Sequence, residues 1–431
     1  MSGHASNELR RIAQAQLSEI LALHAKFRDS RSGGRRAVLI GYDLAGMLGP
    51  GTDLSHADFT GSSFYGSDLS GCRFDCSVLF GCDFRETSLC NASLIHADLR
   101  GCHFAGAVLI GANLFEADLR EGVHVQRDRR GEFHLLRPQD KTTSATSAVF
   151  SGADLTNARL SGVVAIRTDF SDAIMRGCKL IRAHVQGANF SDCDLEGADF
   201  SQADTRDACF RGAVTTGANF NFANLAGADL AGVLSDQPGG RLLAELEEGL
   251  DDLLRLHLQF VGSNGATGRP LDLSGFDLRH APSLAGACLT MVTARKAIFY
   301  GLDLGRVAIQ AAKCDSADFR NCRLDAADMR GIQLAGARLN NASLREVDLR
   351  SLRIDAERQM HTDLNGAILR HADLTNTDLR GVSMISADLS FANLAGAKLN
   401  DADLTNARLV CCKVSRAQLD TTLASHGTGL G

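Results

Sequence analysis

A period of five residues governs most of this sequence. From Leu54 to Leu119 every fifth residue is Leu or Phe without exception, and a small residue stands two positions before nearly all of them. The pattern returns over residues 150–230, 299–354 and 364–419. Neither the 3.6-residue period of a helix nor the two-residue alternation of a flat strand produces it. We therefore expect a chain that turns a corner every five residues and points each small and each large apolar side chain into one narrow core.

Asp or Asn often lies between the small and the large residue, as in Ala97-Asp98-Leu99 and Ala112-Asn113-Leu114. These A(D/N)LXX units resemble the pentapeptide-repeat family, and the resemblance covers most of the chain. It implies an all-β solenoid, a right-handed quadrilateral β-helix with four pentads, about twenty residues, in each coil. Neighbouring coils would lie about 4.8 Å apart, the usual distance between strands.

Residues twenty positions apart become neighbours in such a fold, which makes the core predictable. Phenylalanines recur at this spacing, and we expect their rings to stack along the axis. Phe84 and Phe190 in particular should be fully buried. The two predicted columns are Phe64, Phe84 and Phe104, and Phe150, Phe170, Phe190 and Phe210.

The sequence also repeats on a larger scale, which predicts two tandem solenoid modules. The segment that begins at Leu23-His24 has a counterpart at Leu256-His257. Each copy opens on an amphipathic segment, 9–27 or 242–260, which we expect to be an α-helix that caps the exposed first coil. The expected organisation is an N-terminal capping helix and leader (1–36), a first solenoid (37–234), a linker and second capping helix (235–268), a second solenoid (269–420) and a flexible tail (421–431).

The repeat is interrupted once in each half. The excursion 121–147 is polar and basic, and its default interpretation is a solvated loop. Because long loops on rigid scaffolds often carry function, it is also a candidate contact for an acidic partner. In the second half, Glu357 and Gln359 occupy positions that would face the core and are expected to loop out or to terminate a face of the coil. The candidate partner-binding residues of the first excursion are Arg127, Arg129, Arg130 and Arg137.

No nucleophile motif, phosphate loop or zinc signature is present, so the chain is predicted not to be an enzyme and to hold no cofactor. One outward column consists of metal-ligand residue types twenty apart: His56, Cys76, His96 and Glu116. Parallel side chains of a ladder do not converge on one ion, so no bound metal is expected. Of the 13 cysteines, seven take the small interior position and act as small apolar residues. They are Cys72, Cys82, Cys102, Cys178, Cys193, Cys322 and Cys412.

Charge and composition exclude further classes of protein. The formal net charge of −6 lacks the basic footprint of a nucleic-acid-binding protein. No apolar run reaches the roughly 18 residues that span a bilayer, and the N-terminus lacks the apolar core of a signal peptide. An odd number of cysteines without disulfide spacing favours the cytoplasm. A bacterial effector that is secreted without such a signal is an alternative.

The sequence therefore predicts a non-catalytic cytoplasmic scaffold that binds partner proteins on a rigid β-helix. The alternative, which the resemblance implies through the gyrase-protecting members of the family, is a DNA-mimicking modulator of a topoisomerase. Stacked carboxylates such as Asp98 and Asp118 would suit that role, but Arg100 and Arg120 dilute an acidic field. Those proteins also dimerise through a C-terminal helix, and no helix is expected after Leu419.

The last coil is expected to be uncapped, which has a consequence for assembly. An open coil exposes apolar side chains and unpaired strand edges. We therefore predict a two-fold homodimer in which two C-terminal coils meet near Val414 and Leu419. The alternative is a tail, 421–431, that folds over the end and leaves a monomer.

Overall fold

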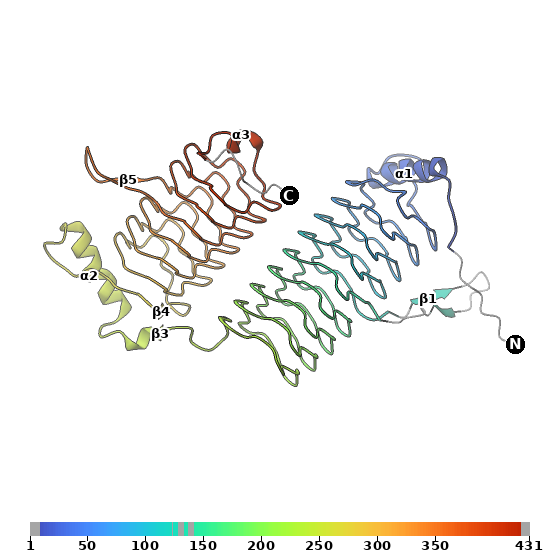
Figure 1. Cartoon of the computed structure of the whole chain (residues 1–431), viewed down its shortest axis with the longest axis horizontal. Coiled ribbons are helices and arrows are strands. Elements are labelled where there is room, and N and C mark those ends of the chain that lie inside the picture. The colour runs from blue at the N-terminus through green and yellow to red at the C-terminus, as the bar shows by residue number, and fades with distance from the viewer. Residues whose placement is uncertain (1–8, 123, 128–132, 137–141, 424–431) are drawn as a thin grey trace. The chain divides into compact units, whose positions relative to one another are not determined.

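The computed structural model describes residues 9–122, 124–127, 133–136 and 142–423, and for 124–127 and 133–136 it describes the backbone alone. The chain forms two compact units, Met1–Gln237 and Pro238–Gly431, and each contains one β-solenoid (Figure 1). The elements are α1 (Gln14–Arg28), β1 (His124–Arg127), β2 (Phe133–Leu136), β3 (Arg241–Leu242), the 3₁₀ helix η1 (Leu243–Glu245), α2 (Leu250–Gly262), β4 (Phe276–Asp277), β5 (Leu352–Arg353), β6 (Gln359–Met360) and α3 (Arg416–Leu419).

Each pentad makes one rung of a ladder and one corner. The residue between the small and the large apolar residue forms a parallel bridge to the next coil, as Asp58 does with Val78. The backbone N–H of the large residue also donates to that next coil. Phe59, for example, donates to the Val78 carbonyl at 2.8 Å. The second corner residue has a positive φ, +66° at Gly61, in the left-handed region that favours glycine. Repetition of this unit gives the expected quadrilateral β-helix.

Asp and Asn at the bridge position stabilise the corner that follows them. Asp58 Oδ1 accepts hydrogen bonds from the backbone N–H of Thr60 at 3.1 Å and from its hydroxyl at 2.7 Å. This is the geometry of an Asx-turn, in which a short side chain accepts from the backbone two residues on. The frequent Asp of the sequence is therefore a turn residue before it is a surface charge.

The core of each unit consists of stacked large side chains flanked by small ones. Phe84 and Phe190 have no exposed surface, as predicted. The rings of the first column stack with centroids 5.0 and 5.3 Å apart, and those of the second column with centroids 5.0 to 5.2 Å apart. Aromatic pairs at such distances stabilise a core beyond the burial of their area alone.

Each interruption contains an antiparallel hairpin that projects from the solenoid, while the coils on its two sides still pair with each other. β1 pairs with β2 in the first unit, and β5 pairs with β6 in the second. The coils continue on either side, because Asp118 bridges Arg159 and Asp348 bridges Asp378. The polar loop that we predicted over 121–147 thus includes β-structure, and Glu357 lies exposed in the second hairpin, as predicted.

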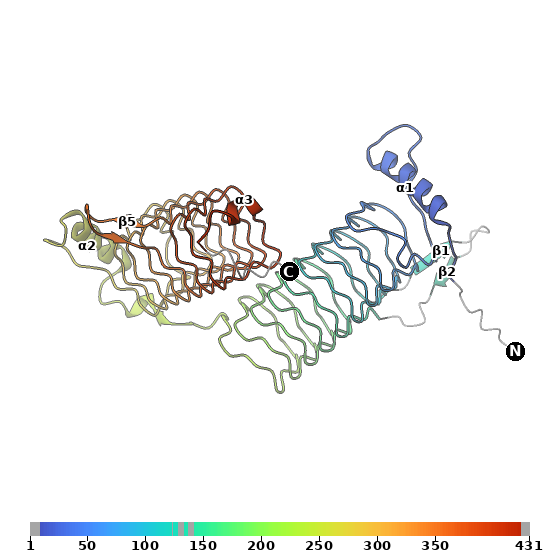
Figure 2. The same cartoon turned by 45° about the horizontal axis from the view of Figure 1, so that its top comes forward.

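The two long helices are shorter than predicted. α1 begins at Gln14 rather than at Leu9, and α2 begins at Leu250 rather than at Leu242. Figure 2 shows α1 at the N-terminal end of the first solenoid. No helix among the described residues is long and apolar enough to cross a membrane.

The residues before each helix are extended because they pair with the first coil. Arg10 bridges Tyr42 in a parallel arrangement, and the Arg10 N–H donates to the Gly41 carbonyl at 2.7 Å. In the second unit, Arg241 of β3 pairs with Phe276 of β4. These pairings satisfy backbone groups at the open edge of the coil, which outweighs the helical pattern of the side chains.

The end of the second solenoid differs from our prediction, because the short helix α3 follows its last coil. The Gln418 side chain donates from Nε2 to the carbonyls of Leu394 and Ala397, each at 2.8 Å. The Leu423 N–H donates to the Ala402 carbonyl at 2.9 Å. Residues of α3 and the chain up to Leu423 therefore lie over the last coil; the rest of the tail, which the alternative prediction also placed there, lies outside the described residues.

Replacing Phe84 by Ala should lower the free energy of unfolding by about 3–5 kcal/mol, because it removes two stacking contacts and leaves a cavity on the axis. Guanidinium denaturation followed by circular dichroism measures the change. Phe222, whose ring is 89% exposed, provides the control, and Phe222→Ala should change stability by less than about 0.5 kcal/mol. Equal effects of the two substitutions would contradict the assigned core.

Candidate functional site

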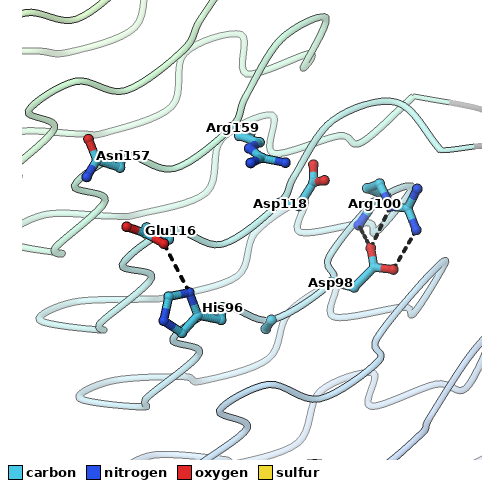
Figure 3. Close-up of a pocket in the computed structure, with 8 residues that line it drawn as sticks. His96, Asp98, Arg100, Glu116, Asp118, Asn157 and Arg159 are labelled. Atoms are coloured by element: carbon cyan, nitrogen blue, oxygen red, sulfur yellow. Dashed lines mark hydrogen bonds and ion pairs between the residues drawn. The ribbon is translucent and has the colours of Figure 1, made fainter.

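A groove of about 510 Å³ lies on the side of the first solenoid, where charged side chains of neighbouring coils come together (Figure 3). The coil-to-coil bridges place its members, since Asp98 bridges Asp118 and Asp118 bridges Arg159. The groove is lined by His96, Ala97, Asp98, Arg100, Glu116, Asp118, Asn157 and Arg159.

Two equivalent Asp–Arg pairs lie at this groove, and Asp98, Arg100 and Asp118 line it. The Arg100 guanidinium donates to both carboxylate oxygens of Asp98, each at 2.7 Å. One coil further, Arg120 donates to Asp118 at 2.9 and 2.7 Å. These two-point contacts are stronger and more directional than a single charged hydrogen bond. We name the set Asp98, Arg100, Asp118 and Arg120 the Asp–Arg ladder.

The pairing favours the charged states of Asp118 and Arg120. Burial raises the pKa of Asp118, but the hydrogen bonds from the Arg120 side chain and backbone outweigh it, and the pKa lies below its usual range. The hydrogen bond to Asp118 likewise raises the pKa of Arg120. Such carboxylates are acceptors that are already engaged, so they are poorly suited to proton transfer at neutral pH.

The column of metal-ligand residue types is only partly brought together. His56, Cys76, His96 and Glu116 all occupy the second corner position, with φ between 54° and 66°. His96 Nδ1 lies 3.3 Å from Glu116 Oε2 (Figure 3). No group of three or more His, Cys, Asp or Glu in the described part of the chain could hold a metal ion.

We expect no stoichiometric metal at this column, because His96 and Glu116 alone supply too few converging ligands. Untagged protein is incubated with zinc, dialysed and measured by elemental analysis, next to His96→Ala as the matched variant. One equivalent of zinc that His96→Ala removes would overturn this expectation.

The cysteines offer no activated nucleophile in the core. Cys82 and Cys102 donate from Sγ to backbone carbonyls at 3.1 and 3.0 Å, and burial raises the pKa of the Cys102 thiol well above its usual value. A thiol of raised pKa is mostly protonated and unreactive. Cys412, which we placed in the core, is only half-buried, whereas Cys314 is fully buried and was not predicted.

The candidate arginines of the first excursion are not brought into a described site. Arg127 lies in β1, where the structure describes the backbone and not the side chain. Arg129, Arg130 and Arg137 lie outside the described residues. Their contact with a partner therefore stays a prediction.

The C-terminal contact residues face their own solenoid. Val414 and Leu419 are half-buried and pack against the core of the second unit. The open coil on which we based the homodimer is therefore covered by α3 and the residues after it. A single chain does not test the dimer, which stays a prediction.

An open end exists instead on the first unit, and sequence reasoning missed it. Phe220 and Leu225 of its last coil are only half-buried, and Leu230 is 48% exposed. The backbone N–H groups of these three residues donate to no other described residue, whereas Phe200 in the coil before donates to Asn219 at 2.7 Å. The sequence contained the signal for this open end, because the repeat stops at Leu230 and the linker follows without a further coil.

The hairpin of the first unit begins beside the Asp–Arg ladder and is anchored by one hydroxyl. The Thr143 hydroxyl donates to the Arg120 carbonyl at 3.0 Å and accepts from the Gly101 N–H at 2.9 Å. The chain thus leaves the coil at Arg120 and returns at Thr143 to almost the same point. The base of the hairpin therefore lies next to the ladder.

The second unit repeats this arrangement. The Thr362 hydroxyl donates to the Arg350 carbonyl at 3.1 Å and accepts from the Gly331 N–H at 2.9 Å. Arg350 pairs with Asp348, and Arg330 pairs with Asp328, as in the first ladder. The similarity of segments 97–120 and 327–350 was the signal for it in the sequence. The residues of the second ladder are Asp328, Arg330, Asp348 and Arg350.

Comparison with known proteins identifies the repeat. The family model for pentapeptide repeats matches over more than half of the chain. The sequence has no significant match among curated proteins. The matched residues are 43–75, 82–120, 146–180, 178–214, 312–350, 360–390 and 387–423.

Several solved structures are similar in fold. Trypsin-treated QnrB1, a plasmid-mediated fluoroquinolone resistance protein, has 24% identity and a TM-score of 0.28 over 47% of this chain and 92% of its own. HetL from Nostoc sp. strain PCC 7120, which is involved in heterocyst differentiation regulation, has 19% identity and a TM-score of 0.19 over 84% and 91%. Rfr23 from Cyanothece 51142 has 24% identity and a TM-score of 0.17 over 29% and 86%. Similarity at this level is no basis for inferring a function.

Proposed function

This chain belongs to the pentapeptide-repeat family, and we propose that it is a non-catalytic scaffold that binds protein partners on the sides of its solenoids. The observation that carries the proposal is the repetition of one surface, an Asp–Arg ladder beside an anchored hairpin, in both units. Stacking does not require either hairpin, because the coils bridge one another directly on both sides of each excursion. Additions of this kind to a rigid scaffold commonly serve recognition.

The chemistry of the ladder supports binding rather than catalysis. Asp98 and Asp118 are each engaged by a guanidinium, and the thiol of Cys102 is buried and protonated. General acid–base catalysis needs a group whose pKa lies near the working pH, and covalent catalysis needs an activated nucleophile. Neither is provided by these side chains.

The ladder suits a polar protein surface that carries both signs of charge. The side chains of Arg100 and Arg120 are 30% and 44% exposed, so their remaining N–H donors face solvent. Because Arg100 and Arg120 are each paired with a carboxylate, the ladder has no excess of positive charge to attract the phosphates of a nucleic acid. Arg127, Arg129, Arg130 and Arg137 of the first excursion are proposed to extend this contact.

We place the protein in the cytoplasm as part of the same proposal. All thirteen cysteines are free thiols, among them the exposed Cys76. Unpaired, accessible thiols persist in reducing compartments and are uncommon in secreted proteins. Secretion as an effector is the competing localisation, and fractionation of the native cell distinguishes the two.

The ladder should be needed for partner binding. We expect the quadruple variant Arg100→Ala, Arg120→Ala, Arg330→Ala and Arg350→Ala to lose specific partners from a native lysate by about tenfold, measured by quantitative mass spectrometry. The control removes four exposed, carboxylate-paired arginines outside the ladders: Arg85, Arg206, Arg295 and Arg323. Equal capture by both variants and the wild type would argue against binding at the ladders.

Modulation of a topoisomerase by DNA mimicry is the second candidate, and the stacking of Asp98 on Asp118 is the feature in its favour. Each of these carboxylates is neutralised by its own arginine, whereas duplex DNA presents unpaired charges at regular spacing. We therefore expect no inhibition of DNA gyrase supercoiling at micromolar protein. A dose-dependent loss of supercoiled product, abolished by Asp98→Asn with Asp118→Asn, would favour mimicry instead.

A further inference from the structure

A buried histidine joins helix α1 to the first solenoid. The His24 side chain is 1% exposed, and its Nδ1 accepts a hydrogen bond from the Ala37 N–H at 3.2 Å. Phe27 stacks on the ring with centroids 5.9 Å apart. Because Nδ1 accepts, the imidazole is neutral and carries its proton on Nε2.

The second unit contains the same arrangement. His257 is fully buried, and its Nδ1 accepts from the Leu271 N–H at 3.0 Å. Its Nε2 lies 3.0 Å from the Thr290 carbonyl, which accepts the Nε2 proton. Phe260 again stacks on the ring. One histidine thus bridges helix, lead-in and coil, and its geometry requires the neutral ring.

These hydrogen bonds lie within otherwise apolar contacts. Leu17 of α1 is fully buried in the core of the first unit, and Ile20 and Leu21 pack against it. In α2 of the second unit, Leu253 lies in the core, and Leu250, the counterpart of Leu17, packs against it half-buried. A charge that forms inside such a contact has no water and few dipoles to stabilise it.

The surroundings of both histidines lower the pKa of the imidazole. Burial is the largest influence on the pKa of His24 and lowers it, Arg28 and His56 lower it further, and Asp53 and the Ser55 carbonyl raise it. Among the described residues, His24 Nε2 has no hydrogen-bond partner of normal geometry. Burial lowers the pKa of His257, and the Thr290 carbonyl partly opposes this.

We propose that His24 and His257 make the docking of α1 and α2 dependent on pH, so that mild acid releases each helix from its solenoid. A proton on Nδ1 turns this acceptor into a donor. In His24 it would then face the Ala37 N–H and in His257 the Leu271 N–H, so each ring loses its Nδ1 hydrogen bond. The apolar residues that each helix covers then become accessible to solvent.

The pH window follows from linkage. Each histidine has a lower pKa in the docked state than in the released state, where the ordinary value is about 6.5. The neutral ring therefore stabilises docking fully above about pH 6.5, and this contribution is lost as the pH falls below that value. The loss continues until the pH reaches the lowered pKa of the docked ring.

Hydrogen exchange at pH 7.5 and pH 5.5, corrected for the intrinsic rates, tests the proposal on the full chain. Peptides of α1 and α2 should lose protection in acid, by up to about tenfold between these two pH values, because at pH 5.5 a released ring with a pKa of about 6.5 is protonated in a ratio of about ten to one. Peptides from the middle of each solenoid should be unchanged. Equal protection of both helices at the two pH values would overturn the proposal.

Asn in place of each histidine separates titration from packing, because its Oδ1 accepts a hydrogen bond near the position of Nδ1 and does not titrate. We expect His24→Asn with His257→Asn to keep the same helix protection at both pH values. His184→Asn with His280→Asn, at two exposed positions, should respond as the wild type does. A pH response that persists in the first variant would contradict the assignment.

A second measurement keeps the proposal testable if the double variant does not fold. The imidazole Hε1 signals of the wild type are titrated by NMR, and single variants assign the two resonances. Midpoints below 6.5 for His24 and His257, together with acid-induced loss of helix protection, support the proposal. Midpoints at or above 6.5 for both would refute it.

Discussion

The hydrogen bond from each large core residue to the next coil is the interaction on which the rest of the structure depends. Phe59 donates to Val78 at 2.8 Å, and the same bond recurs along both solenoids. It recurs where a further coil follows, because a corner of positive φ, as at Gly61, turns the chain between rungs. A backbone that is satisfied in this way needs no particular outward side chain. The outer surface of the solenoid can consequently vary in charge and can accept loops without loss of the fold.

That freedom explains why the ladders and hairpins stand out. Most outward Asp residues have a local purpose, since Asp58 accepts from Thr60 and closes its corner. Asp98 does the same for Arg100 and is in addition clamped by its guanidinium. The anchor of Thr143 on Arg120, and of Thr362 on Arg350, then places a hairpin beside each ladder. The repetition of a feature that stacking does not require is the argument for recognition at this surface.

Residues that touch the next coil could be predicted, and residues that touch a more distant part of the chain could not. Phe84 follows from the twenty-residue rule alone, because its neighbours Phe64 and Phe104 lie at fixed spacing. The start of α1 was wrong, because Arg10 pairs with the coil at Tyr42, a contact that no local pattern shows. The cover of the last coil, which was only the alternative prediction, likewise depends on non-periodic contacts such as those of Gln418 with the carbonyls of Leu394 and Ala397.

The sequence by itself determined the quadrilateral solenoid, its core and the absence of a recognisable catalytic motif, because a strict five-residue period leaves the backbone one way to satisfy its hydrogen bonds. The tertiary structure alone decided where the helices begin, that α3 covers one end, and that Thr143 and Thr362 hold equivalent hairpins. It also decided the state of His24, since only folding buries the ring against the Ala37 N–H. These features depend on contacts between segments whose separation follows no period, and their energies become visible only when the coils are stacked.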